Sequence, residues 1–267
     1  MSRHIPVLMY HNIVEKTTDD APDWVSTDLF RQQMNYILKK GFTPILPQAL
    51  LTPEKIPKKP ILITFDDGYE GVYTQAFPIL KEFKINATVF LITSCLDNQL
   101  HRYKNEWSNG DRPLTYHLSI EMVKEMLATN IITVGCHSHS HKYFKGIPTS
   151  EIENEIITSQ KLIKDKLNII NTIFSYPGGY IGEKGNTYEI LKNNDIQLAF
   201  GAQTNIIENI DTIDCFNIHR INISNDNKFT NTKAKHRFEV LVNPLLNTLG
   251  KYNKLNFLVN SLIKIIK

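Results

Sequence analysis

The chain has 267 residues, of which 42% are hydrophobic and 21% charged, as in an ordinary globular protein that buries a sizeable core. Its net charge of +3 and its scattered lysines do not indicate nucleic acid as a partner. Cys95, Cys136 and Cys215 are widely spaced without a C-x-x-C pair, so we expect buried free thiols in a reducing compartment. We see no signal peptide and no membrane-spanning run, and therefore expect a cytoplasmic protein.

Short apolar runs alternate with helical patterns, which predicts a parallel α/β fold in a single domain. In chain order, strands are expected at 5–10, 61–65, 87–92, 131–136, 171–177 and 196–201, and helices at 27–41, 73–85, 119–129, 150–167 and 187–194. Pro78 lies within the second helix or restarts it. Ser150 and Glu153 have the spacing of a capping box at the fourth helix. Residues 95–118 are polar and irregular and indicate an inserted loop.

The apolar run at 61–65 ends in two adjacent carboxylates, Asp66 and Asp67, within the stretch ILITFDDGYE. Like charges at the end of a buried strand repel each other, and a divalent cation beside them would offset that repulsion. One aspartate could then bind the cation while the other removes a proton from water as a general base.

Three histidines, His137, His139 and His141, follow the apolar strand expected at 131–136, in the stretch VGCHSHSHKYF. On a strand all three share a face, and on a helix His137 and His141 lie one turn apart, so either geometry can present two imidazoles to a metal. A solvated histidine-rich turn is the alternative. Side chains at the carboxyl ends of parallel strands converge on one face, which favours a joint site with the aspartates. One aspartate and two histidines also describe non-haem iron oxygenases, but the second aspartate favours hydrolysis.

Together, TFDDGY (64–69) and HSHSH (137–141) resemble the first two motifs of polysaccharide deacetylases with NodB homology, T-F-D-D-G and H-[S/T]-x-x-H. The segments VLMYHNI, KKGF and NATVFL are similar to the poly-N-acetylglucosamine deacetylase-like subgroup, whose motif order is permuted. The resemblance covers about residues 5–223. It implies a distorted, incomplete (β/α) barrel, which we place at residues 1–249.

By this resemblance, Asp66 corresponds to the general base, and Asp67, His137 and His141 to the metal ligands. The metal implied is one divalent ion, with zinc favoured and cobalt, nickel, manganese or iron as alternatives. The third motif, R-x-P-Y-G, corresponds to SYPGG (175–179). Gly178 takes the place of its tyrosine, whose backbone N–H helps to hold the oxyanion, and a glycine keeps that donor.

The remaining roles have competing candidates. Ser175 stands where the third motif has arginine, and Arg220 is the candidate replacement, with a surface arginine as the alternative. The permuted motif order points to His11 as general acid, and His219 competes with it. A last set of residues either lines the sugar site or packs in the core: Tyr10, Tyr69 and Tyr176.

The expected reaction is hydrolysis of an N-acetyl group of an amino sugar, in a polysaccharide or a lipid-linked saccharide, by attack of a metal-bound water. The alternatives are hydrolysis of another amide, such as a cyclic imide or ureide, and a saccharide-binding protein without activity. Residues 250–267 have an apolar helical face and several lysines. They predict an amphipathic basic helix that packs on the barrel or rests on anionic lipid at the inner face of the membrane.

Overall fold

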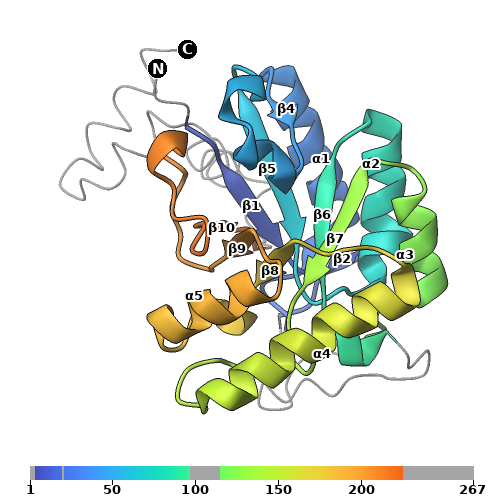
Figure 1. Ribbon diagram of the computed structural model, residues 1–267. Coiled ribbons are helices and arrows are strands. Elements are labelled where there is room, and N and C mark those ends of the chain that lie inside the picture. The colour runs from blue at the N-terminus through green and yellow to red at the C-terminus, as the bar shows by residue number, and fades with distance from the viewer. Residues whose placement is uncertain (1–3, 20, 97–114, 225–267) are drawn as a thin grey trace. The chain divides into compact units, whose positions relative to one another are not determined.

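The computed structural model describes residues 4–19, 21–96 and 115–224 (Figure 1). The chain divides into two compact units, Met1–Asn225 and Asp226–Lys267, and the second lies outside the described residues. The boundary at residue 249 and the amphipathic helix at 250–267 therefore stay predictions, as does most of the polar loop at 95–118. No helix among the described residues is long and apolar enough to cross a membrane.

Parallel strands form the central sheet of the described part, in the order β10-β1-β5-β6-β7-β8-β9, with β4 beside β5. These strands are β1 (Val7–Tyr10), β4 (Thr43–Pro44), β5 (Pro60–Phe65), β6 (Ala87–Leu91), β7 (Ile132–Cys136), β8 (Ile173–Ser175), β9 (Leu198–Phe200) and β10 (Ile221–Asn222). A separate two-stranded sheet pairs β2 (Ile13–Val14) with β3 (Val25–Ser26). The main sheet is curled and open, which confirms the distorted (β/α) barrel.

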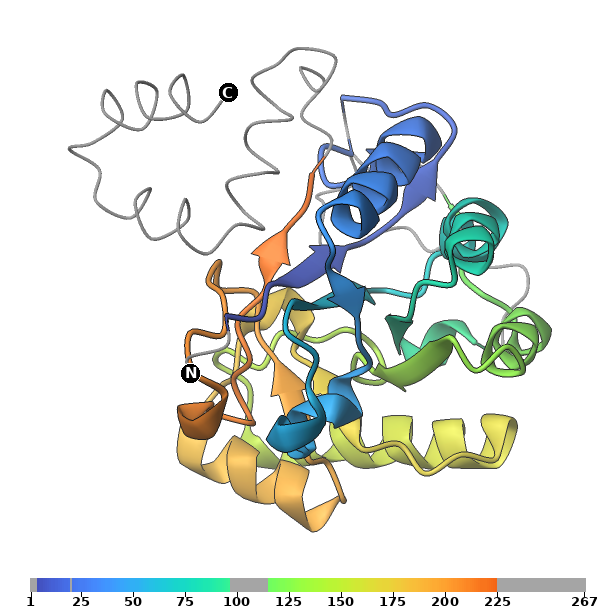
Figure 2. The ribbon, with the colours of Figure 1, turned by 90° about the horizontal axis from the view of Figure 1, so that it is seen from above.

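Five α-helices of the described residues lie around the outside of the curled sheet (Figure 2). They are α1 (Thr27–Lys39), α2 (Phe77–Phe83), α3 (Ile120–Leu127), α4 (Thr149–Leu167) and α5 (Lys184–Asn193). Pro78 marks a restart of the helix. It is the second residue of α2, which follows directly on a π-helical turn, Val72–Ala76.

The capping box predicted at Ser150 and Glu153 is wrong. The helix α4 begins at Thr149, and Pro148 occupies the N-cap position without a side-chain capping bond. The carbonyl of Pro148 accepts the N–H groups of Glu151 and Ile152 at 3.0 and 3.2 Å, so Ser150 already lies inside the helix. The fixed φ of proline, here −59°, sets this start.

The segment before β10 crosses the opening between the two edges of the sheet. Phe200 in β9 forms a parallel bridge with Ile218, and the Gly201 N–H donates to the Ile218 carbonyl at 2.9 Å. Three residues later, Ile221 pairs with Leu8 in β1. Residue 220 therefore lies between β9, at one edge of the sheet, and β1, next to the other edge. From this position its side chain can enter the barrel.

Apolar side chains fill the interior below the carboxyl ends of the strands. One buried cluster contains Ile5, Val7, Leu62, Phe90, Ile173, Leu198, Phe200 and Ile218, among others. Two cysteines, Cys95 and Cys136, are buried free thiols as expected, and burial raises the pKa of each to about 12. Cys215 is only half-buried.

Candidate metal and catalytic site

The two aspartates lie where β5 ends. The N–H of Asp66 continues the ladder and donates to the Tyr10 carbonyl at 2.9 Å. Asp67 and Gly68 then both adopt left-handed backbone conformations, with φ of 70° and 68°. A Cβ at Gly68 would lie 3.0 Å from Leu91 Cδ2, so both the positive φ and the limited space favour glycine. For Asp67 this conformation is strained, as is common at functional sites.

His137 and His141, the first and last histidines of the motif, follow the end of β7. The His137 N–H donates to the Leu91 carbonyl at 2.9 Å, and its Nδ1 lies 2.8 Å from the Ser175 carbonyl. This bond places the Nδ1 proton, so Nε2 is the nitrogen that can act as a ligand. Ser138 and His141 have φ of 61°, and the His141 N–H donates to Ser138 Oγ at 2.9 Å. The tight loop thereby returns His141 to a place beside His137.

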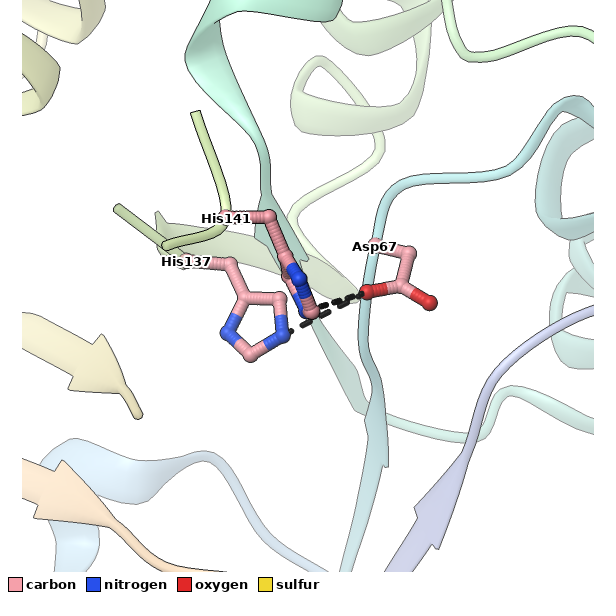
Figure 3. Close-up of side chains that lie close together, drawn as sticks. All are labelled: Asp67, His137 and His141. Carbon is pink, nitrogen blue, oxygen red and sulfur yellow. Dashed lines mark ion pairs between the residues drawn. The ribbon is translucent and has the colours of Figure 1, made fainter. Parts of the chain in front are cut away.

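These residues converge on one point, shown in Figure 3. Asp67 Oδ1 lies 3.4 Å from His137 Nε2 and 3.3 Å from His141 Nε2. All three side chains are buried, and their ligand atoms lie within 4.8 Å of one another. Asp67 Oδ1 has no hydrogen-bond partner among the described residues. A buried carboxylate oxygen facing two imidazoles fits a divalent metal such as zinc.

The third histidine of the motif lies outside this cluster. His139 Nδ1 is 3.1 Å from Thr93 Oγ1.

The electrostatics of the cluster favour the charged form of Asp67. Burial raises the pKa of Asp67, but the imidazoles of His137 and His141 outweigh burial and hold that pKa well below its usual value.

Asp66 has a different environment, made by Arg220. The guanidinium donates to both carboxylate oxygens of Asp66 at 2.7 Å, and Ser175 Oγ donates to Asp66 at 3.2 Å. Arg220 is completely buried, and its Nε also donates to the Gly201 carbonyl at 2.8 Å. Burial raises the pKa of Asp66, but Arg220 and then His137 outweigh it and keep that pKa below its usual value. The carboxylate is therefore ionised, oriented and next to the cluster.

The two candidate acids lie in different places. His11 follows β1 directly, and its Nδ1 lies 3.6 Å from Asp23 Oδ2. A charge on His11 would lower the pKa of both Asp66 and Asp67, which places it in the field of the cluster. His219 instead lines a pocket of about 390 Å³ formed by residues between 205 and 219. Neither aspartate of the motif lines that pocket, so the structure brings His11, and not His219, to the site.

Gly178 is exposed in the loop after β8, within the short 3₁₀ turn Pro177–Gly179, and has φ of 60°. Tyr10 and Tyr176 are part of the core, because both are buried and their hydroxyls donate to Gln33 Oε1 and the Phe216 carbonyl. Of the two alternatives left open by the sequence, the structure therefore shows core packing for Tyr10 and Tyr176. Tyr69 is also buried, with its ring 4.9 Å from that of His117.

Three contributors to the site are not indicated by the sequence motifs. Ser175 links the two halves, since its hydroxyl binds Asp66 and its carbonyl binds His137. Glu155, from α4, accepts hydrogen bonds from the N–H groups of residues 139 and 140 at 2.9 and 2.7 Å and from Ser140 Oγ at 2.6 Å. His117 lies near Asp67, and burial lowers its pKa to about 4, so it is neutral. Glu155 falls on the apolar face of the expected helix, so the helical spacing alone predicts that its side chain is buried.

The family model of polysaccharide deacetylases matches residues 54–199, which is more than half of the chain. The chain belongs to the polysaccharide deacetylase family. It is 30% identical to YxkH of Bacillus subtilis (strain 168) over 184 residues, which are 67% of this chain and 58% of YxkH. It is 29% identical to the poly-beta-1,6-N-acetyl-D-glucosamine N-deacetylase of Staphylococcus epidermidis over 64% of this chain and 57% of that protein.

The fold is also that of solved deacetylase structures. The structure of IcaB from Ammonifex degensii superposes with a TM-score of 0.71 at 24% identity, over 87% of this chain and 96% of that chain. At this identity the likeness concerns the fold alone. The chain spans about half the length of several curated relatives that it matches, between 50% and 58% of them, and 21% of the enzyme of Escherichia coli (strain K12).

Proposed function

We propose that this chain is a metal-dependent hydrolase that removes N-acetyl groups from an amino sugar. One observation carries the proposal: an ionised aspartate, Asp66, is fixed by Arg220 beside a buried carboxylate–imidazole cluster of Asp67, His137 and His141. Members of the family to which the chain belongs are named for deacetylation of polysaccharides, which supports the same reaction.

The residues of the site divide the reaction among them. A divalent cation held by Asp67, His137 and His141 would polarise the acetyl carbonyl and lower the pKa of a water. Asp66 accepts the proton of the attacking water, and Arg220 holds both of its oxygens in place for that step.

The tetrahedral oxyanion and the leaving nitrogen need two further groups. The amide of Gly178, in the loop after β8, donates a hydrogen bond to the oxyanion. His11, whose Nδ1 faces Asp23 at 3.6 Å, gives a proton to the departing nitrogen. The products are acetate and a free amine.

The family and its named relatives support a proposal for the substrate. Several of these relatives carry the name poly-beta-1,6-N-acetyl-D-glucosamine N-deacetylase, which favours an N-acetylglucosamine saccharide. A lipid-linked saccharide on the cytoplasmic side of the membrane is a variant of the same proposal. The basic amphipathic pattern at 250–267 motivates it.

The test uses the purified, zinc-loaded full chain with a panel of N-acetylated oligosaccharides and lipid-linked sugars, and it measures acetate release and bound metal. Asp66→Asn is expected to keep the metal and lose turnover by at least about 10²-fold, the lower range of acid–base catalysis. His137→Ala is expected to lose both metal and turnover. His139→Ala is the matched control, because its ring contacts Thr93 outside the cluster, and it should keep both.

Wild-type turnover in Asp66→Asn would refute the role of this base. Turnover of cyclic imides or ureides in place of sugars would move the activity to another amide. Acetate release without oxygen and without a 2-oxoacid would exclude an iron oxygenase, and saccharide binding without acetate release would indicate a binding protein.

A further inference from the structure

Position 178 departs from the family motif, since glycine stands where the third motif has tyrosine. A Cβ at Gly178 would lie 2.9 Å from Tyr143 Cε1 and 3.1 Å from Tyr180 Cδ2. The space that a side chain at this position would enter is therefore filled by the rings of two tyrosines from elsewhere in the chain. One comes from the loop after β7, and the other follows the loop after β8.

These two tyrosines form an exposed aromatic pair. Their ring centroids lie 5.3 Å apart at an interplanar angle of 44°. Tyr143 is 40% exposed and Tyr180 is 42% exposed, in contrast to the buried Tyr10, Tyr69 and Tyr176. The pair therefore presents aromatic surface to solvent, and the buried tyrosines do not.

The pair adjoins the metal cluster. The Tyr143 ring lies 5.7 Å from the ring of His141, which lies 4.8 Å from that of His137. A continuous row of rings thus leads from the cluster to the surface. Lys145 Nζ lies 5.6 Å from the centre of the Tyr180 ring, so the outer end of the row also carries an ammonium group.

We propose that Tyr143 and Tyr180 form a carbohydrate subsite that binds the pyranose ring next to the reacting acetamide. This inference rests on the proposed deacetylase function and adds the surface that would hold its substrate. Tyrosine rings combine an apolar face with a polar hydroxyl, which suits a sugar ring whose C–H groups are apolar and whose hydroxyls are polar. Because Gly178 has no side chain, both rings fit beside the residue whose backbone amide is assigned to the oxyanion.

The test compares two acetyl substrates in the zinc-loaded full chain. One is the tetramer of β-1,6-linked N-acetylglucosamine, and the other is 2,2,2-trifluoroethyl acetate, which has no ring. Tyr143→Ala and Tyr180→Ala are each expected to raise KM for the tetramer roughly 2- to 12-fold, the range of one aromatic contact, with little change in kcat. Hydrolysis of the ring-free ester should be unchanged.

Two controls separate ring stacking from a structural effect. Tyr143→Phe and Tyr180→Phe keep the rings and should keep a KM near that of the wild type. Tyr73→Ala removes a tyrosine that is paired with Glu125 of α3, and it should leave both substrates unaffected. Because Tyr143 and Tyr180 are exposed, the alanine variants should fold, and circular dichroism checks this.

Calorimetric titration with the same tetramer distinguishes failure of the subsite from failure of the enzyme assignment. Binding that weakens in both alanine variants, without acetate release by the wild type, would support the subsite and refute deacetylation of this saccharide. Acetate release with an unchanged KM in both variants would overturn the subsite and leave the deacetylase function in place. Absence of any tetramer binding by the wild type would overturn the subsite as well.

Discussion

Asp66 and Asp67 are neighbours in the chain and have different partners. Asp66 is held by a guanidinium, with both oxygens bound at 2.7 Å, and Asp67 faces two imidazoles at 3.3 and 3.4 Å. The left-handed conformation of Asp67 turns the chain between them. The two adjacent carboxylates therefore face different partners, a guanidinium for Asp66 and two imidazoles for Asp67.

Arg220→Met tests the first of these pairings. The substitution leaves the buried Asp66 carboxylate without a counter-charge, so we expect the free energy of unfolding to fall by about 3–5 kcal/mol. Urea denaturation followed by circular dichroism measures it. Acetate release should fall at the same time, because the base loses its orientation.

The double variant Asp66→Asn/Arg220→Met is the control. It removes both charges, so its stability should recover relative to Arg220→Met alone. If the two single losses simply add, the ion pair is not the source of the effect.

Sequence reasoning reaches the residues of local motifs and fails for contacts made across the barrel. Asp67, His137 and His141 belong to compact motifs, and the structure brings them together. Arg220 is 154 residues from Asp66, so the resemblance, and not spacing, indicated it. For Tyr176 the sequence leaves both a sugar-lining and a core position open, because a tyrosine beside a motif has the same letter whether it faces solvent or core. Only tertiary packing distinguishes those cases.

At the scale of elements, α4 supports the histidine loop. Glu155 lies on its buried face and accepts three hydrogen bonds from residues 139 and 140, between the two histidines of the cluster. The helix itself was expected at 150–167 and is observed at Thr149–Leu167. Its periodic apolar stripe predicts such a helix well, and Glu155 falls within that stripe, but the pattern gives no indication of which loop the glutamate binds.

Glu155→Gln is expected to weaken zinc binding about 10- to 100-fold, because the loop that orients His137 and His141 loses an acceptor for its N–H groups. Competition with a chromogenic chelator measures the affinity. Glu153→Gln is the matched control, since this glutamate is exposed on the same helix and should leave the affinity unchanged. Equal affinities in the two variants would show that α4 does not position the loop.

At the scale of the whole molecule, the cluster joins the ends of β5 and β7, with β6 between them. A ligand bound across separate strands stabilises the folded state, because the unfolded chain does not hold these side chains together. The same contacts that prepare the reaction should therefore contribute to the stability of the barrel.

Zinc at 100 times its dissociation constant is expected to raise the free energy of unfolding by about 2.7 kcal/mol over the chelated protein. Thermal unfolding with zinc and with a chelator measures the difference. In His137→Ala the difference should largely disappear. A zinc-dependent Tm that persists in this variant would place the stabilising metal elsewhere.

Because Arg220 holds Asp66, the orientation of the base depends on a segment near the end of the described chain. The metal ligands lie at residues 67, 137 and 141, whereas the guanidinium that holds Asp66 arrives only with the segment that leads into β10 and pairs beside β1. A nascent or clipped chain that ends before this segment carries every ligand, but its base keeps Ser175 and lacks Arg220 as a partner. Such a fragment could capture zinc without acquiring an oriented base, so catalytic competence depends on completion of the barrel.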